Sequence, residues 1–323
     1  MEEENLPEVV LSSGQKMPII GLGTGGGTSS LPPNNVLTSI FIDAIQIGYR
    51  HFDTAANYGT EEALGQAVAK ALEKDIIKSR DQIFITSKLW CTDANHDLVL
   101  PALNATLKKL GLDYVDLYLI HWPVRLKQGV EGLKFTGEDI IPFDMKGTWE
   151  AMEECHRLGL VKSIGVSNFG IKKLTQLLEN ATIPPAVNQV EMSPIWQQGN
   201  LREFCKQKGI YVTAWSPLGA YNALWGSPAV MENPILQDIA LARKKSVAQI
   251  AIRWICEQDA GAIVKSFNKE RMKQNLEIFD WELSQEESEK ISQIPQRRQF
   301  RAELFISENG PYKSFEELWD DDV

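Results

Sequence analysis

The segment GYRHFDTAANYGTEE, residues 48–62, contains the pattern that decides the fold. Its apolar run predicts a strand over residues 50–53, and its last residues open an amphipathic stretch that predicts a helix over residues 61–73. A polar loop carrying Tyr58 joins the two elements. The segment therefore predicts one strand–loop–helix unit with an acid, Asp53, at the end of its strand.

The same unit recurs along the chain. Apolar runs predict further strands at residues 17–22, 83–86, 115–121, 163–166, 187–190, 210–214 and 262–264. Between them, helical spacing predicts helices at residues 98–110, 145–158, 171–178 and 201–208. Strands that alternate with helices in this way form a parallel sheet.

Polar residues at the strand ends distinguish between the two common parallel folds. Asp53, Lys88, His121, Asn168 and the run 189–191 each lie at or just past the end of a different predicted strand. In a barrel these ends meet at one mouth, whereas an open sheet would spread them along a crevice. We therefore predict an eight-stranded (β/α) barrel of the TIM-barrel class, forming a single domain over residues 1–323.

Three irregular segments, residues 124–143, 219–233 and 295–323, interrupt or follow this alternation. Loops of this length are usually functional or mobile. If they lie at the mouth they would wall a substrate pocket, and surface decoration is the alternative.

A glycine pattern near the N-terminus suggests a different fold. Gly21, Gly23 and Gly26 satisfy the GxGxxG fingerprint of Rossmann dinucleotide sites. That site needs the glycine turn to open directly into a helix whose N-terminus holds the pyrophosphate. Here Pro32 and Pro33 delay any helix to about Asn35. We therefore interpret the glycines as a loop beside the mouth.

Composition excludes several classes of partner. The net charge of −10 and the pI near 5.1 argue against a nucleic-acid or anionic-membrane surface, because both need a basic face. The N-terminus carries acids, and no apolar run approaches a membrane helix in length. The 4 cysteines lie far apart without a CxxC pair, which predicts reduced thiols in a cytosolic protein. No metal site is predicted.

Four residues at the predicted mouth suit acid catalysis on a carbonyl group. A free tyrosine, with a pKa near 10, donates its proton poorly at neutral pH, and a neighbouring ammonium such as that of Lys88 lowers this pKa. Asp53 would pair with Lys88, because either charge buried alone is costly. A neutral His121 can hydrogen-bond the incoming carbonyl oxygen. Tyr58 is then the proton donor.

Taken singly, each of these residues has another explanation. Tyr58 could be structural, Asp53 could cap the following helix, and His121 could be a satisfied core histidine. Their joint placement favours the catalytic interpretation.

These four residues belong to a longer pattern, because the sequence resembles the aldo-keto reductase superfamily along nearly its whole length. Residues 48–55 match its Gly-x-Arg-x-x-Asp-Thr-Ala motif, and residues 107–121, LKKLGLDYVDLYLIH, match its second motif. Residues 263–275, where Ile-Val-Lys-Ser precedes an Arg and an Asn, match the third. The resemblance places the family's catalytic tetrad on Asp53, Tyr58, Lys88 and His121.

The resemblance also implies a cofactor, NADPH or NADP+, held across the mouth without a Rossmann domain. Its carboxamide would be held by the strand-end residues Ser167, Asn168 and Gln189. Trp215 stands where relatives often have a tyrosine that stacks on the nicotinamide. Lys265, Ser266 and Arg271 would bind the 2′-phosphate, which favours NADPH over NADH, and an ordinary solvated helix start is the alternative. The expected cofactor contacts are Thr24, Asp53, Ser167, Asn168, Gln189, Trp215, Ser216, Leu218, Lys265, Ser266, Phe267, Asn268, Arg271, Gln274 and Asn275.

Two departures from the family pattern bear on the substrate. Three glycines, residues 25–27, replace an aromatic that often follows Thr24, which opens one side of the pocket. His121 is retained where relatives that reduce carbon–carbon double bonds carry Glu, which favours carbonyl reduction. The expected substrate contacts are Asn57, Trp90, His121, Trp122 and Trp225.

Four segments, KSRDQIFITSKLW, PFDMKGTWEAMEEC, PPAVNQVEMSP and KSVAQIAIRW, resemble a plant group of the superfamily. It includes codeinone, methylecgonone and chalcone (polyketide) reductases, deoxymugineic acid synthase and galacturonate reductase. These enzymes act on different substrates, so the likeness implies a reaction class. We expect a monomeric reductase of a specialised-metabolism ketone or aldehyde, with an alkaloid ketone preferred. The alternatives are a detoxifying aldehyde or sugar reductase, a polyketide reductase, and a non-enzymatic NADPH-binding protein.

Overall fold

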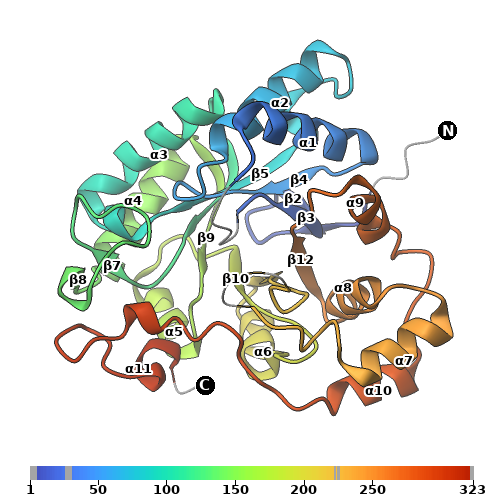
Figure 1. The fold of residues 1–323 in the computed structure, drawn as a ribbon. Helices are drawn as coiled ribbons and strands as arrows, with labels where there is room; N and C mark the ends of the chain where they lie inside the picture. Colours follow the sequence, from blue (N-terminus) through green and yellow to red (C-terminus); the bar gives the residue numbers. More distant parts are fainter. Residues whose placement is uncertain (1–5, 26–30, 222, 224–225, 321–323) are drawn as a thin grey trace.

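The computed structural model describes residues 6–25, 31–221, 223 and 226–320. Within them eight parallel strands close a barrel in chain order, and the last strand pairs with the first. Figure 1 shows the helices arranged around these strands. The barrel strands are β3 (Ile20–Gly23), β4 (His51–Asp53), β5 (Phe84–Leu89), β6 (Val115–Ile120), β9 (Val161–Ser167), β10 (Val187–Glu191), β11 (Tyr211–Trp215) and β12 (Ala260–Val264). The predicted (β/α) barrel is confirmed.

Helices follow the barrel strands along the chain, as the alternating pattern predicted. They are α1 (Asn34–Ile47), α2 (Glu61–Glu73), α3 (His96–Leu110), α4 (Met145–Arg157), α5 (Ile171–Asn180), α6 (Gly199–Gln207), α7 (Pro234–Arg243), α8 (Val247–Glu257), α9 (Lys269–Leu276), α10 (Gln285–Ser292) and α11 (Phe315–Trp319). Short 3-10 helices lie at Arg80–Gln82, Cys91–Asp93, Gly137–Asp139 and Glu303–Phe305. Among the described residues the first helix, α1, begins only after Pro33, which agrees with the rejection of a Rossmann site.

The prediction of one strand over residues 17–22 is wrong. Lys16–Pro18 forms β2, which pairs antiparallel with β1 (Glu8–Val10), and the barrel strand β3 begins only at Ile20. Pro18 has no N–H to continue a ladder, so the chain turns at Ile19 between the two sheets. The hairpin lies at the strand-start end of the barrel, where Leu11 and Met17 are buried in one cluster with residues such as Phe84 and Val187.

The buried apolar residues form separate clusters at different levels of the barrel. The largest fills the space between strands and helices, from Ile20 and Leu37 through to Ile294. A second, here called the mouth cluster, contains Trp90, Cys91, Trp122, Val124, Leu126, Ile140, Ala302, Phe305, Leu318 and Trp319. Its tryptophans Trp90 and Trp122 lie one and two residues past the ends of β5 and β6. The opening above the strand ends therefore has an apolar packing of its own.

The three irregular segments all contribute to the structure around this mouth. The first contains the hairpin β7 (Arg125–Leu126) and β8 (Ile140–Ile141), whose apolar side chains enter the mouth cluster. The segment after α10 supplies Phe305 and Trp319 to the same cluster. The loop after β11 contacts that segment through a hydrogen bond from Ser227 Oγ to Gln299 Oε1. Of the two positions that the sequence left open, the described residues of these segments favour the one at the mouth.

The final segment is also attached to the barrel by a buried ion pair. Lys173 of α5 pairs with Asp320, and its ammonium donates to the carbonyls of Glu317 at 3.1 Å and Leu318 at 2.9 Å. The Asp320 carboxylate in turn accepts the N–H of Lys173 at 3.0 Å, near the start of α5. An anion at a helix N-terminus is favourable, so this contact stabilises both elements.

Within the described ranges, no helix has both the length and the apolar character needed to cross a bilayer. The same residues contain no group of three His, Cys, Asp or Glu side chains placed to hold a metal ion. All four cysteines are free thiols, three of them buried.

Helix packing provides a test of the fold. A Cβ added to Gly65 of α2 would lie 2.0 Å from the backbone oxygen of Leu110, the last residue of α3. We expect Gly65→Ala to force the two helices apart and to lower the free energy of unfolding by about 1–3 kcal/mol, as overpacking does.

Urea denaturation checks this expectation. The control is Gly199→Ala at the first residue of α6, where an added Cβ would meet nothing within 4 Å. Its stability should be unchanged or slightly higher, because alanine is the better helix former. Equal stability of the two variants would contradict the proposed close contact.

Candidate active site

A buried ion pair lies at the bottom of the mouth. Lys88 of β5 and Asp53 of β4 are 0% and 2% exposed, and Lys88 Nζ lies 2.5 Å from Asp53 Oδ1. Lys88 Nζ also donates to the backbone oxygen of Thr54 at 2.9 Å, and Asp53 Oδ2 accepts from Gln189 Nε2 at 2.8 Å. Both charges are therefore paired and hydrogen-bonded, which is the condition under which buried charges are tolerated.

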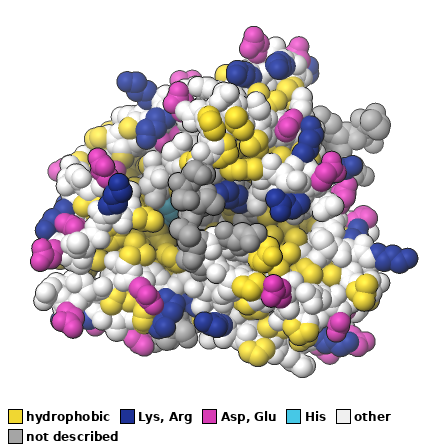
Figure 2. All heavy atoms as spheres, in the orientation of Figure 1, with side chains coloured by type: hydrophobic (Ala, Val, Ile, Leu, Met, Phe, Trp, Pro, Cys, Tyr) yellow, Lys and Arg dark blue, Asp and Glu magenta, His cyan; other side chains and the backbone are white. Residues whose placement is uncertain are grey.

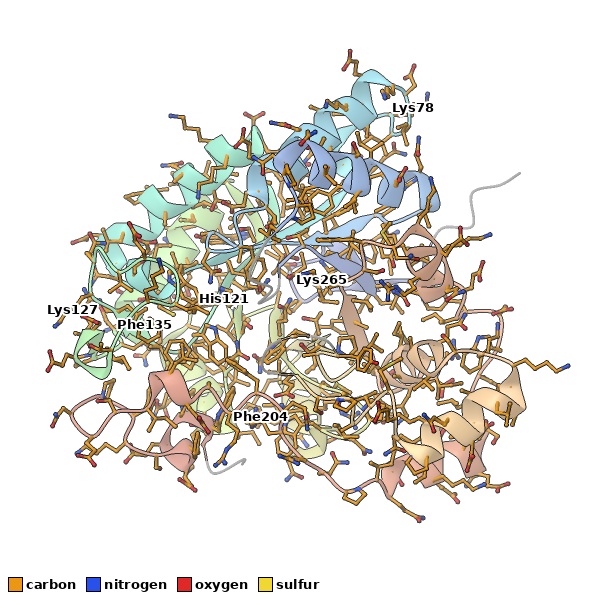
Figure 3. All side chains as sticks on the ribbon, viewed as in Figure 1. Lys78, His121, Lys127, Phe135, Phe204 and Lys265 are labelled. Atoms are coloured by element: carbon orange, nitrogen blue, oxygen red, sulfur yellow. The ribbon has the colours of Figure 1, made fainter. Side chains whose placement is uncertain are left out.

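Tyr58 and His121 complete a continuous chain of polar atoms from this pair. Lys88 Nζ lies 3.5 Å from the Tyr58 hydroxyl, and that hydroxyl lies 3.4 Å from His121 Nε2. These contacts are long for hydrogen bonds, as catalytic contacts often are without substrate. Figure 3 labels His121 near the centre of the mouth, and Figure 2 shows histidine atoms on the same face. The strand ends thus bring together the four residues that the sequence grouped.

The electrostatic environment corrects one sequence-based expectation. Burial raises the pKa of Tyr58 above its usual value of 10, and the nearby Lys88 ammonium lowers it without outweighing burial. The predicted lowering of the Tyr58 pKa by Lys88 is therefore present, but the opposing effect of burial, which the prediction left out, is larger. Burial would lower the pKa of Lys88, but the Asp53 carboxylate raises it above 10.5, so Lys88 stays charged.

The backbone of Gly25 lies directly against the Tyr58 ring. A Cβ added at Gly25 would come within 2.3 Å of Tyr58 Cδ2. Any side chain there would have to displace the ring, so the glycine in place of an aromatic is a packing requirement in this chain. Gly26 and Gly27, the other two of the three glycines, lie outside the described residues.

The three amide and hydroxyl residues predicted to hold a carboxamide form one network beside the tetrad. Ser167 Oγ donates to the Gln189 backbone oxygen at 2.7 Å, and Asn168 Nδ2 donates to the His121 backbone oxygen at 2.9 Å. Asn168 Oδ1 accepts from Trp215 Nε1 at 2.9 Å, which fixes the indole next to the mouth. Asn168 and Ser216 have left-handed φ values of 65° and 52°, a conformation that costs energy outside glycine and often marks functional sites.

The predicted phosphate residues lie after β12 and at the start of α9. Lys265 Nζ lies 5.0 Å above the Phe267 ring, and Ser266 is buried. Asn268 caps α9 by accepting the N–H of Arg271 at 2.9 Å, and the Arg271 side chain is exposed. Burial lowers the pKa of Lys265, and no carboxylate of the described residues offsets that loss. In Figure 3, Lys265 lies across the mouth from His121.

The four other predicted cofactor residues differ in how far they are buried. Thr24 is fully buried, and its hydroxyl lies 2.7 Å from that of Thr60, so the side chain is already engaged. Asn275 is buried beside Tyr49, whereas Gln274 is exposed and Leu218 is half-buried.

The predicted substrate residues surround His121. The Trp90 ring meets it edge-on at 5.2 Å, and the Trp122 ring lies nearly parallel to it at 6.5 Å. Asn57 Oδ1, Trp90 Nε1 and His121 Nδ1 are buried and have no hydrogen-bond partner among the described residues. Buried polar atoms usually find a partner, so these atoms are available to a ligand. The remaining predicted contact, Trp225, lies outside the described residues.

Sequence reasoning missed the aromatic residues that the final segment brings to the mouth. The Phe300 ring lies 5.7 Å from Trp122 and 6.0 Å from Trp215, and Phe305 and Trp319 also pack on Trp122. The segment was predicted to wall the pocket, but no residue in it was named. Its concentration of aromatic residues in a region without helical or strand periodicity was the available signal.

Comparisons with known proteins agree with this geometry. The aldo/keto reductase family model matches residues 19–296. The chain belongs to the aldo/keto reductase family. It is 59% identical to rhazimal reductase 2 of Alstonia scholaris and 57% identical to protein REDOX 2 of Catharanthus roseus, in each case over 100% of both chains. It is 55% identical to deoxymugineic acid synthase 1 of Zea mays over 95% of this chain and 97% of that one.

Solved structures give the same family. The crystal structure of an aldo-keto reductase of Bombyx mori in complex with NADP superposes with a TM-score of 0.84 and 37% identity, covering 93% of this chain and 96% of that one. The aldose reductase of Schistosoma japonicum also has a TM-score of 0.84, with 34% identity. This aldo/keto reductase is therefore an oxidoreductase, and the predicted recognition and enzyme class are confirmed.

The histidines of this aldo/keto reductase provide a pH test. Burial lowers the pKa of His51 to about 4, and burial together with Lys88 lowers that of His121 well below 6.5. The hydrogen bond to Asp97 instead raises the pKa of the exposed His96. In an NMR titration between about pH 8 and 5, we expect His96 to titrate while His51 and His121 remain neutral.

The same shifts fix the sign of a stability effect. The unfolded chain binds protons at His51 and His121 below about pH 6.5, whereas the folded chain does not, so the free energy of unfolding should fall as pH falls from that value. For His51 this loss continues to about pH 4. Titration of either imidazole near its ordinary pKa in the folded protein would contradict the burial argument.

Proposed function

We propose that this enzyme is an NADPH-dependent carbonyl reductase with Tyr58 as general acid. The observation that carries the proposal is the unbroken contact chain from Asp53 through Lys88 and Tyr58 to His121, at 2.5, 3.5 and 3.4 Å. Such a chain supplies a proton donor, a cation that stabilises the resulting phenolate, and a neutral imidazole beside them. These groups suit acid catalysis on a carbonyl oxygen, because the donor supplies the proton and the other two stabilise and orient the reacting atoms.

The residues around the mouth fit NADPH. Lys265 is a half-buried cation, and no carboxylate among the described residues offsets its loss of hydration. With Arg271 and the Ser266 hydroxyl it would hold the 2′-phosphate. Ser167, Asn168 and Gln189 would hold the carboxamide, and the fixed Trp215 indole would support the nicotinamide. The Bombyx mori relative was solved with NADP, which supports the same choice. NADPH, when bound, supplies the hydride that the carbonyl carbon accepts.

The protein's own groups would handle the proton. The Tyr58 hydroxyl is protonated at neutral pH, and the Lys88 ammonium, which lowers the Tyr58 pKa against the raising effect of burial, favours release of its proton. Proton transfer to the carbonyl oxygen leaves a phenolate, which Lys88 stabilises as a full cation held by Asp53. His121, kept neutral by its lowered pKa, would donate one N–H to orient the carbonyl oxygen.

The aromatic surroundings support a bulky, partly apolar carbonyl substrate. Trp90 and Trp122 pack beside His121, and Phe300 packs on Trp122, so the surroundings of the proposed carbonyl site are aromatic. Two similar plant proteins, one of them named a rhazimal reductase, support a ketone or aldehyde of specialised metabolism, with an alkaloid ketone preferred. A broad aldehyde or sugar reductase and a polyketide reductase are the alternatives. We also propose a monomeric, single-domain, cytosolic enzyme, with the four free thiols supporting the compartment.

Replacing Tyr58 tests the general acid. We expect Tyr58→Phe to lower kcat by about 100-fold or more, the usual range for loss of a general acid, because the ring remains but the donor is lost. NADPH oxidation at 340 nm, measured with small aldehydes, sugars and cyclic ketones, checks the rate, and quenching of tryptophan fluorescence checks that NADPH still binds. Full activity in this variant would refute the role of Tyr58.

Replacing Arg271 tests the phosphate site. We expect Arg271→Ala to raise the KM for NADPH by about tenfold or more, the effect of one lost charge-assisted hydrogen bond, and to leave that for NADH nearly unchanged. Lys273→Ala is the control, since Lys273 is another cation of α9 and pairs with Glu277 at 3.8 Å. An unchanged KM for NADPH in Arg271→Ala would remove Arg271 from the site.

A further inference from the structure

Glu191, the last residue of β10, is a buried carboxylate at the mouth and lies outside the tetrad. It is 1% exposed, and Oε1 accepts the backbone N–H of Gln299 at 2.9 Å while Oε2 accepts that of Phe300 at 3.0 Å. Both N–H groups belong to the segment that follows α10. A carboxylate that binds two consecutive backbone N–H groups holds that stretch of chain in one position and orientation.

The residue held in this way joins two parts of the mouth. Phe300 packs on Trp122, which stands next to His121, and on Trp215, which pairs with Glu191 across the β10–β11 register. Its ring therefore connects the wall around the carbonyl site with the indole proposed to support the nicotinamide. A shift of the Phe300 backbone would move a wall of the pocket without moving Tyr58 or Lys88.

Neighbouring contacts make Glu191 the centre of a larger attachment. Gln299 Oε1 accepts from Ser227 Oγ, in the loop after β11, so the Gln299 backbone and side chain connect two of the mouth segments. Two residues before Gln299, the backbone N–H of Arg297 donates to the Ile195 oxygen at 2.7 Å. The stretch that carries Phe300 is therefore attached to the barrel at more than one point.

We propose that Glu191 is a positioning residue that determines which carbonyl compounds the mouth accepts. By holding the Gln299 and Phe300 N–H groups, it fixes Phe300 against Trp122 and Trp215 and so sets the space for the bulky part of a substrate. This inference rests on the proposed carbonyl reductase function. A small aldehyde would reach Tyr58 and His121 without reaching Phe300, so the effect depends on substrate size.

Glutamine at this position would break the attachment while preserving shape. The carboxylate offers an acceptor oxygen to each N–H, whereas a glutamine amide offers one oxygen and turns an NH2 donor toward the second N–H. Glu191→Gln therefore loses one hydrogen bond and brings the glutamine NH2 group against a backbone N–H, so that two donors face each other. The side-chain volume stays nearly the same.

The chain contains a second buried glutamate that binds consecutive backbone N–H groups, far from the mouth, and it serves as a control. Glu153 of α4 is also buried, and its Oε1 accepts the consecutive N–H groups of Thr182 at 2.7 Å and Ile183 at 2.8 Å. These N–H groups precede the start of β10, at the opposite end of the strand from Glu191. Its Oε2 accepts from Arg157 Nη2 at 3.0 Å, so Glu153→Gln can keep an oxygen on both N–H groups but loses this ion pair. The variant therefore removes a buried carboxylate that holds backbone N–H groups, and it should leave the mouth intact.

The experiment compares wild type, Glu191→Gln and Glu153→Gln with saturating NADPH and two probes, 2-decalone as a bicyclic ketone and propanal as a small aldehyde. We expect Glu191→Gln to raise the KM for 2-decalone about tenfold, the effect of losing one charge-assisted hydrogen bond, and to change that for propanal less than about twofold. Hydrogen exchange at the Gln299 and Phe300 amides should become faster in this variant alone.

Several outcomes would overturn the inference. An equal change in KM for both probes, a similar KM ratio in Glu153→Gln, or unchanged exchange at Gln299 and Phe300 would each show that Glu191 does not position the wall. If wild type reduced neither probe nor any other carbonyl compound, the proposed function would fail instead. The exchange measurement would still decide whether Glu191 fastens the segment.

Discussion

Burial of the Lys88–Asp53 pair is the constraint on which the rest of the site depends. Two charges removed from water must be paired and must have their remaining hydrogen bonds satisfied. Thr54 supplies a backbone oxygen to the ammonium, and Gln189 supplies an amide to the carboxylate from across the barrel. The pair thereby fixes the relative positions of β4, β5 and β10 at their ends. Tyr58 and His121 lie beside an ammonium group that these contacts hold in one position.

The residues that could be predicted from sequence are those that barrel geometry itself brings together. Asp53, Lys88 and His121 end successive strands, and parallel strands present their ends at one mouth, so their proximity follows from topology. The net pKa of Tyr58 could not be read in the same way, because it depends on how much water the folded mouth excludes. Similarly, the apolar run 17–22 reads as one strand, whereas in the structure its two halves join different sheets on either side of a bend at Ile19.

The aromatic residues around the mouth were less predictable than the residues at the strand ends. Phe300, Phe305 and Trp319 lie in a segment without helical or strand periodicity, and their partners Trp122 and Trp215 are distant in the sequence. Nothing local in the sequence indicates such contacts. They depend on attachments such as Lys173 to Asp320, whose charges read as ordinary surface residues until the fold buries them. Strand order therefore specifies the residues at the strand ends, and long-range packing specifies the aromatic residues around them.

The mouth cluster is separate from the larger core between strands and helices, and this separation affects how the enzyme can evolve. Substitutions at sites that share no partners tend to act additively, so changes in the mouth aromatics need not disturb the packing that keeps the barrel folded. After a gene duplication, one copy could acquire a new substrate selectivity with little loss in its free energy of unfolding. A lineage built on this architecture can therefore diversify its chemistry by altering a few segments above a barrel that stays the same.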